Sequence, residues 1–173
     1  MAERDEACHT FSRPTARAFI ERNKAGAAYI YLSYGAHWML NVLVKGASNG
    51  FVLIRAAQPV RGIELMKKRR GLDDERRLCS GPGKLTQAFD VTNRRHEMNL
   101  CVDPRHCFAH TPDGDVDSSR RSQAKADVVA DKRIGITRSA HHPWRFTIRG
   151  NKYVSVPVRS LTRSSIDRNS SLR

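Results

Sequence analysis

The feature that most constrains the fold is a dense run of hydrophobic residues between positions 29 and 56. Within this run, segments 29–34, 38–44 and 51–56 each have the composition of a β-strand, and glycine-containing turns separate them. Strands that follow one another through such short connections predict an antiparallel meander. We therefore expect a sheet to form the centre of the molecule.

The rest of the chain is expected to be mixed in structure. Residues before position 28 are polar, basic and turn-rich, and residues 93–132 have the composition of a long irregular loop. The pattern predicts helices at 61–70 and 81–89, and further strands at 133–137, 144–148 and 153–156. At 173 residues, one domain spanning 1–158 is expected, with a disordered Ser- and Arg-rich tail at 159–173.

The charge of the chain indicates its class of partner. Lys and Arg number 31 against 17 Asp and Glu, which gives a formal net charge of +14. Such an excess favours a polyanion, because cationic side chains displace counterions from a phosphate backbone. A protein that is basic for other reasons is the alternative at this point.

Membrane and metal partners are not indicated. No hydrophobic run approaches the roughly 20 residues that a membrane-spanning helix needs, and the first residues do not have the order of a secretory signal. The four cysteines are expected to be reduced thiols. One cluster, Cys101, His106, Cys107 and His110, matches no common zinc spacing, so we expect no metal site.

Three tyrosines lie close together in the first predicted strand. Tyr29 and Tyr31 alternate onto one face of the sheet, whereas Tyr34 is next to the Gly35 turn and should point elsewhere. Aromatic side chains beside basic residues suit the stacking of nucleobases. Tyrosine is also a common residue of ordinary strands, so the spacing alone leaves both interpretations open.

Two polar residues interrupt hydrophobic strands. Asn41 is a lone amide within segment 38–44, and it either makes a structural hydrogen bond or faces a cleft. Arg55 comes near the end of the third strand, where its guanidinium must be paired, lie at a site, or mark the exit of the strand into solvent.

Several blocks of sequence, in this order, resemble the alkyladenine (3-methyladenine) DNA glycosylase family. Many blocks in register are far more specific than any single one. They cover roughly residues 5–156: Asp5-Glu6-Ala7-Cys8-His9, Thr15-Ala16-Arg17, Tyr29-Ile30-Tyr31-Leu32-Ser33-Tyr34-Gly35 with Asn41, Leu53-Ile54-Arg55-Ala56 with Pro59, Gly81-Pro82-Gly83-Lys84-Leu85 with Gln87-Ala88, Arg133-Ile134-Gly135-Ile136, Pro143-Trp144-Arg145-Phe146, and Gly150-Asn151 with Val154-Ser155.

The resemblance implies both a fold and a reaction. The fold would be of the α/β (α+β) class, a single domain with a curved, mainly antiparallel sheet flanked by helices. The protein would be a monomer that flips a damaged purine out of double-stranded DNA and hydrolyses its N-glycosidic bond with an activated water. Neither a metal nor an organic cofactor would be needed, because an alkylated, cationic base is already a good leaving group.

Family roles also transfer by position. His9 and Tyr31 would line the base pocket and stack on the extruded base, and Asn41 would exclude normal guanine by clashing with its exocyclic amine. Tyr34 would fill the gap left in the duplex. Arg55 would lie near the nucleophilic water.

The resemblance implies two further contacts and one difference. Arg17 and Lys84 would contact a phosphate or support the structure. The family's general base is a glutamate in an E-x-E-A-Y motif, which would lie upstream of Met1. Either the initiator methionine is internal to a longer reading frame, which the upstream DNA sequence would reveal, or the chain is a truncated product that we expect to be unstable and inactive.

Two other functions compete with the glycosylase. A catalytically inactive DNA-binding relative would bind lesions without releasing a base, and a basic protein of a ribonucleoprotein would explain the charge alone. The glycosylase interpretation implies a cytoplasmic, nucleoid-associated protein in a bacterium and a nuclear protein in a eukaryote.

Overall fold

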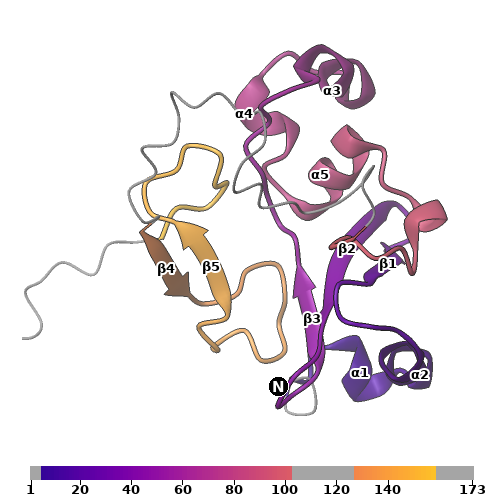
Figure 1. Cartoon of the computed structure of the whole chain (residues 1–173). Helices are drawn as coiled ribbons and strands as arrows, with labels where there is room; N and C mark the ends of the chain where they lie inside the picture. The colour runs from indigo at the N-terminus through magenta and orange to yellow at the C-terminus, as the bar shows by residue number, and fades with distance from the viewer. Residues whose placement is uncertain (1–4, 103–126, 159–173) are drawn as a thin grey trace, which may run out of the picture.

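The computed structural model describes residues 5–102 and 127–158. It has helices and two antiparallel sheets in one α/β domain, which confirms the predicted fold class. Helices gather on both sides of the larger sheet, and a β-hairpin lies beside its third strand (Figure 1). The tail predicted at 159–173 lies outside the described residues.

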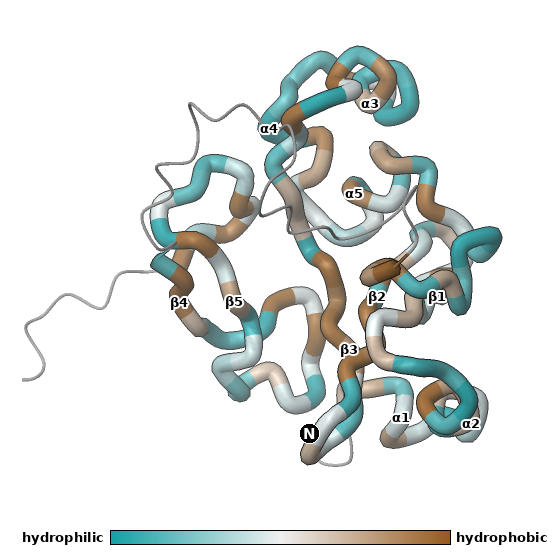
Figure 2. The backbone as a smooth tube through the Cα atoms, viewed as in Figure 1, coloured by the Kyte–Doolittle hydropathy of each residue, from teal (hydrophilic) through white to brown (hydrophobic). Residues whose placement is uncertain are grey.

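The larger sheet is the meander that the hydrophobic pattern predicted. It contains β1 (Ala28–Ser33), β2 (His37–Val44) and β3 (Gly50–Leu53), in the order β1-β2-β3 with antiparallel pairing. The third strand is shorter than expected. Beyond Ile54, whose N–H still donates to the Leu40 carbonyl, the chain turns toward another partner, and the Ala57 N–H donates to the Cys79 carbonyl. The hydrophobic stretch that runs through β3 is visible in Figure 2.

The first residues contain two helices that the sequence pattern did not predict. These are α1 (His9–Ser12) and α2 (Pro14–Arg22). Proline is favoured in the first turn of a helix, where its missing N–H has no intrahelical partner. The polar composition hid the short apolar face of α2, which buries Ala16 and Phe19 against the sheet.

The predicted helices at 61–70 and 81–89 are confirmed as α3 (Ile63–Arg70) and α5 (Pro82–Phe89), with α4 (Glu75–Leu78) between them. Helix α5 packs on β2, where the Thr86 hydroxyl donates to the Trp38 carbonyl over 2.8 Å. A short 3₁₀ helix, η2 (Asn93–Arg95), replaces part of the loop expected from position 93.

Only one of the three strands predicted after position 132 is present in the second sheet, and its partner strand falls within the segment 93–132 that was expected to be a loop. The sheet consists of β4 (Val128–Asp131) and β5 (Arg145–Ile148), so the strand predicted at 144–148 is confirmed. The strand predicted at 133–137 is wrong, because that segment belongs to the loop that leads to β5, closed by the Arg133 N–H on the Ala140 carbonyl. Segment 153–156 is not a strand either, since the N–H groups of residues 153 and 154 fold back onto Asn151.

The sheet separates two hydrophobic clusters, and this separation determines which side chains can reach a cleft. One cluster, which includes Ile30 and Leu40, packs with α3, α4 and α5. The other contains Phe19, Tyr29 and Leu43. Because side chains alternate along a strand, Tyr31 shares the second face with Tyr29, as the sequence predicted.

Candidate active-site cleft

A cleft of about 790 Å³ lies between the larger sheet and the β4–β5 hairpin. Its walls come from segments far apart in the sequence: residues 5–9, strands β1 and β2, the length of β3, the loop at 133–136 and strand β5. Four of the residues expected from the sequence line this cleft together: His9, Tyr31, Asn41 and Arg55.

His9 and Tyr31 form an aromatic wall. Their ring centroids lie 4.1 Å apart with an interplanar angle of 51°. A hydrogen bond of 3.0 Å joins His9 Nδ1 to the Tyr29 hydroxyl. Burial, and secondarily the charge of Arg13, lowers the pKa of His9 to about 4, so the imidazole is neutral at physiological pH. Burial raises the pKa of Tyr31, which keeps this phenol protonated.

Asn41 both makes a structural hydrogen bond and lines the cleft, so the two options left open by the sequence are compatible. Its side chain is 6% exposed, and Nδ2 donates to the Tyr29 carbonyl over 3.1 Å. A second, longer contact joins Nδ2 to the Met39 carbonyl over 3.5 Å. Because Asn41 lies opposite Tyr29 in the pairing of β1 and β2, the sheet itself fixes the orientation of the amide.

Arg55 is half-buried in the wall of the cleft, just beyond the end of β3. Burial lowers the pKa of its guanidinium, the charge of Arg145 lowers it further, and Tyr31 acts in the opposite direction. Gly135 is close by, since a Cβ atom at this glycine would lie 3.8 Å from Arg55 Nη2. Among the described carboxylates, none forms an ion pair with Arg55.

Tyr34 lies outside the cleft, at the turn between β1 and β2. Tyr34 is 99% exposed, and its backbone φ of 51° is in the left-handed region. Gly35 follows with φ of 68°. The turn thus presents an aromatic ring to solvent, away from Tyr29 and Tyr31, as the sequence predicted.

The two basic residues assigned to phosphate or structural contacts lie in different settings. Arg17 Nη1 donates to the carbonyl of Thr10 over 2.9 Å and to that of Phe11 over 3.4 Å, and so it holds the end of α1. Lys84 is exposed in the first turn of α5. Its neighbour Gly83 packs the same turn against β2, since a Cβ atom at Gly83 would lie 3.0 Å from the His37 ring.

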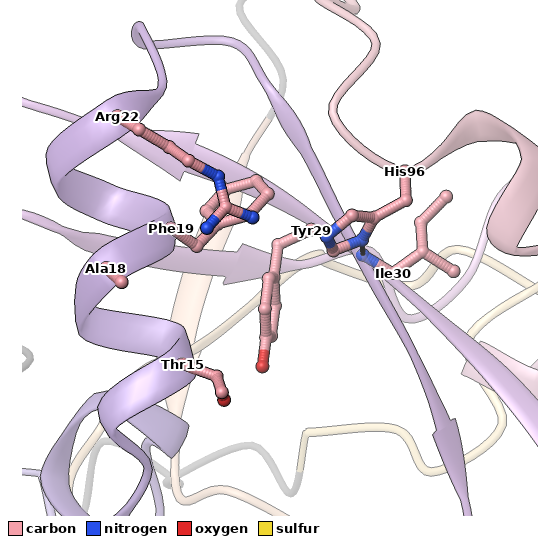
Figure 3. Close-up of a pocket in the computed structure, with 7 residues that line it drawn as sticks. All are labelled: Thr15, Ala18, Phe19, Arg22, Tyr29, Ile30 and His96. Atoms are coloured by element: carbon pink, nitrogen blue, oxygen red, sulfur yellow. Dashed lines mark hydrogen bonds between the residues drawn. The ribbon is translucent and has the colours of Figure 1, made fainter.

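A smaller hollow of about 330 Å³ lies behind the aromatic wall, between α2 and β1. It is lined by Phe19, Tyr29, His96 and Arg22, among others. The Tyr29 hydroxyl points away from His96 and Arg22 (Figure 3). Two of its polar side chains have partners within the protein: His96 Nδ1 accepts from the Ile30 N–H over 3.0 Å, and Arg22 pairs with Glu97 over 2.5 Å. Since Tyr29 borders the hollow and also contacts Tyr31, the hollow lies against the back of the aromatic wall.

The cleft also contains a pair that the sequence did not single out as functional. The carboxylate of Asp5 and the guanidinium of Arg133 form two hydrogen bonds, of 2.6 and 2.8 Å. Both residues line the cleft, and Asp5 is the one carboxylate among the described lining residues. Their separation of 128 positions explains why local patterns could not reveal the pair.

The metal hypothesis concerns residues that are mostly outside the described part of the chain. Cys101 is exposed, whereas His106, Cys107 and His110 lie in the undescribed segment. Within residues 5–102 and 127–158, no group of three His, Cys, Asp or Glu side chains is arranged to hold a metal ion. The helices of these ranges are also too short or too polar to traverse a bilayer.

The chain is similar to a known family over most of its length. The family described as "Methylpurine-DNA glycosylase (MPG)" matches residues 1–152. A protein of Rhodopseudomonas palustris (strain HaA2) named "Putative 3-methyladenine DNA glycosylase" is 43% identical over 156 residues, which are 90% of this chain and 72% of the relative. A protein of the same name from Nitrosospira multiformis is 42% identical over 156 residues, covering 90% of this chain and 75% of the relative.

These similarities agree with the resemblance inferred from the sequence blocks, and they give no support to a non-catalytic or ribonucleoprotein function. The family match spans both walls of the cleft, from the segment that contains His9 to strand β5. The chain belongs to the methylpurine-DNA glycosylase family and is a DNA-repair glycosylase.

Proposed function

We propose that the cleft receives an alkylated purine flipped out of duplex DNA, and that the protein hydrolyses the N-glycosidic bond of such bases, 3-methyladenine among them. The observation that carries this proposal is the wall of His9 and Tyr31, whose rings lie 4.1 Å apart in a cleft of about 790 Å³. This volume lies within the range of roughly 300–1,000 Å³ that is typical of small-ligand pockets.

The charge state of the wall favours a cationic base. An alkylated purine such as 3-methyladenine carries positive charge, and aromatic faces attract cations through their ring quadrupoles. The lowered pKa of His9, about 4, leaves the imidazole uncharged at neutral pH, so it does not repel such a base. The raised pKa of Tyr31 preserves the neutral phenol ring.

Asn41 supplies selectivity against guanine. Its amide is anchored to the Tyr29 carbonyl, so it cannot rotate away from a base that enters the cleft. A fixed amide would clash with the exocyclic amine of guanine, whereas adenine-type bases carry no amine at that position. A buried polar group that cannot rearrange discriminates strongly between related substrates.

Arg55 is suited to hold the nucleophilic water. The reaction joins the water oxygen to C1′ of the sugar, a proton of that water is released to the solvent, and the base leaves with the electron pair of the N-glycosidic bond. The half-buried guanidinium has no ion-pair partner among the described carboxylates, so its donors can bind the water. We assign no proton transfer to Asp5, because Arg133 already occupies both of its oxygens.

Tyr34 is the candidate wedge. An exposed ring on a tight turn can enter the space that the flipped nucleotide vacates, which offsets part of the cost of unstacking. Lys84, exposed at the positive end of α5, suits a phosphate contact, whereas the geometry of Arg17 supports its structural role. We expect a monomer acting on DNA, and in a bacterial cell like those of its relatives it would work at the nucleoid.

The test compares two duplexes that differ in one base, 3-methyladenine or adenine, by measuring the dissociation constant for each and the release of free base. We expect preference for the damaged duplex. Tyr34→Ala should weaken binding to that duplex by about tenfold, because stacking of an aromatic side chain on a base contributes roughly 1–3 kcal/mol. The melting temperature should hardly change, since Tyr34 is 99% exposed.

Phe11→Ala is the matched control, because Phe11 is also an exposed aromatic residue but lies on helix α1 instead of the turn between β1 and β2. It should leave the affinity for damaged DNA as it is. Equal affinity of the native protein for both duplexes would contradict the proposed function. Unchanged affinity of Tyr34→Ala would contradict the role of this tyrosine as the wedge.

A further inference from the structure

We propose that Arg133 is a positioning residue for base recognition: through its ion pair with Asp5 it fixes the place of His9 across the cleft. We call this pair the Asp5–Arg133 clasp. The inference rests on the proposed function, because it concerns how the wall of His9 and Tyr31 is held ready for a flipped base. The clasp connects segment 5–9, which contains His9, to the loop between β4 and β5 on the opposite side of the cleft.

The geometry of the clasp is that of a strong, oriented interaction. Arg133 Nη1 donates to Asp5 Oδ2 over 2.6 Å, and Nη2 donates to Oδ1 over 2.8 Å. The two side chains are 17% and 13% exposed. Parallel hydrogen bonds between a planar guanidinium and a carboxylate fix the orientation as well as the distance, which a lysine cannot do.

Asp5 transmits this constraint to His9 through a tight turn. Its Oδ1 also accepts the Ala7 N–H over 3.0 Å, and its carbonyl accepts the Cys8 N–H over 2.8 Å. The next residue is His9, the first of α1, whose ring contacts Tyr29 and Tyr31. The carboxylate that binds Arg133 therefore also sets the backbone turn from which His9 projects.

Arg133 is itself held firmly on the opposite side. Its Nη2 donates to the Ser139 carbonyl over 2.7 Å, and its guanidinium lies 5.2 Å from the centroid of the Trp144 ring. The Trp144 ring in turn stacks with the His142 ring, with centroids 4.1 Å apart and an interplanar angle of 12°. The clasp thus joins His9 to a rigid stack rather than to a free side chain.

The consequence is that two walls contributed by distant segments keep a fixed separation before DNA arrives. Without the clasp, His9 would still follow its own turn, but the turn would no longer be tied to the hairpin side. A site held in its productive geometry in advance binds more selectively than one that must be ordered on binding. The loss should therefore fall on discrimination between damaged and undamaged DNA.

The test is a double-mutant cycle between Arg133 and His9. Its readout is a discrimination ratio, defined as the dissociation constant for the adenine duplex divided by that for the 3-methyladenine duplex. Arg133→Lys, which keeps the charge and removes the paired geometry, should lower this ratio by about tenfold, as coupled contacts of 0.5–3 kcal/mol allow. In the His9→Ala protein, the same substitution should change the ratio by less than about twofold.

Asp5→Asn provides a second route to the same result should Arg133→Lys reduce the folded fraction. It keeps an acceptor for the Ala7 N–H and removes the ion pair, so it should reproduce the loss in the native background. Combined with Arg133→Lys, it should add little, since both changes break one contact.

Arg145→Lys is the matched control. Arg145 lies in the same layer and pairs with Asp131 over 2.6 Å, but it makes no contact with the segment of His9. Any effect of this substitution should be the same with or without His9. If the losses from Arg133→Lys and His9→Ala simply multiply, or if Arg133→Lys leaves the ratio unchanged, the clasp has no such role. Failure of the proposed function would be distinct, because His9→Ala itself would then leave the ratio unchanged.

Discussion

The two sides of the cleft are stabilised by different kinds of interaction. The larger sheet is packed between hydrophobic clusters, and residues such as Phe19, Leu43 and Leu78 are almost completely buried. The β4–β5 hairpin exposes hydrophobic side chains instead, with Phe146 at 65% exposure. Its most buried large residue on β5 is Arg145, at 5%.

This difference teaches which physical force specifies each wall. On the sheet side, non-directional burial of apolar surface holds the strands together. On the hairpin side, directional pairs between arginine and aspartate are the notable contacts. The buried Arg145 joins β5 to Asp131 of β4, and Arg133 joins the loop between these strands to Asp5. Substitutions that remove volume should therefore be most damaging on the first side, and substitutions that remove charge on the second.

The largest effect is expected from Phe19→Ala. Phe19 is 1% exposed and contacts the rings of Tyr29, Phe51 and His96, so its removal leaves a cavity. We expect the free energy of unfolding in urea to fall by about 3–5 kcal/mol. Phe146→Ala, on the hairpin, should lower it by less than about 1 kcal/mol. Similar losses for both would contradict the distinction between the two sides.

Arg145→Ala should have the next largest effect. Its guanidinium donates to the carbonyls of Lys132 and Val156 as well as to Asp131, and removing it leaves these acceptors without their donor. Since Asp131 is partly exposed and can be hydrated, we expect a loss of about 3 kcal/mol, the lower end for a broken buried pair. Arg149→Ala removes an exposed pair and should change the stability by less than about 1 kcal/mol. Chemical denaturation of both variants decides this.

Gly26→Ala should have an intermediate effect. The backbone φ at Gly26 is +88°, and an added Cβ atom would lie 2.7 Å from Asn99 Oδ1 and 2.8 Å from Cys101 Sγ. We expect a loss of about 2 kcal/mol in thermal or urea unfolding, from backbone strain together with crowding. Gly150→Ala, with φ of +67° and open space around it, isolates the strain alone and should cost about 1 kcal/mol. A larger loss at Gly150 would reverse the expected order.

The smallest effect concerns pH. Burial on its own would raise the pKa of Asp5, but the hydrogen bonds from Arg133 and the Ala7 N–H, with the charge of Arg133, hold it below its usual 3.8. The folded protein therefore binds fewer protons at this group than the unfolded chain does. The contribution of the clasp is complete above the usual pKa and is lost as the pH falls through the folded value.

The measurement is the difference in unfolding free energy between the native protein and Asp5→Asn, followed with pH. This difference should be constant near neutral pH and should shrink once the pH falls below 3.8. A difference that grows on acidification would contradict the sign of the pKa shift. Both proteins are compared in the His9→Ala background, because the pKa of His9 is lowered to about 4 and its titration would overlap that of Asp5.

The sequence predicted the larger sheet well because its hydrophobic runs and glycine turns are local signals. Strands at 29–34 and 38–44, helices at 61–70 and 81–89 and the strand at 144–148 match the structure closely. Helix α2 was missed because its apolar face is short and its composition is basic. The strand predicted at 133–137 was wrong because the backbone and side chain of Arg133 bond to residues 140 and 139 of its own loop, and its guanidinium also binds the distant Asp5.

The same contrast applies to the site. Family resemblance, together with the tyrosine spacing, brought His9, Tyr31, Asn41 and Arg55 to one cleft, where the structure places them. The partners of these residues could not be predicted, because the hydrogen bond from Asn41 to Tyr29 depends on strand register and the clasp depends on tertiary packing.

The separation of Asp5 and Arg133 by 128 positions also has a consequence for how the molecule forms in time. During synthesis the N-terminal residues leave the ribosome first, at roughly 5–20 residues per second. The sheet and its helices can begin to pack while the hairpin is still being made, since contacts between neighbouring segments form fastest. The Asp5–Arg133 clasp must wait for loop closure over most of the chain, so we expect full discrimination between damaged and undamaged DNA to be the last property that the nascent protein acquires.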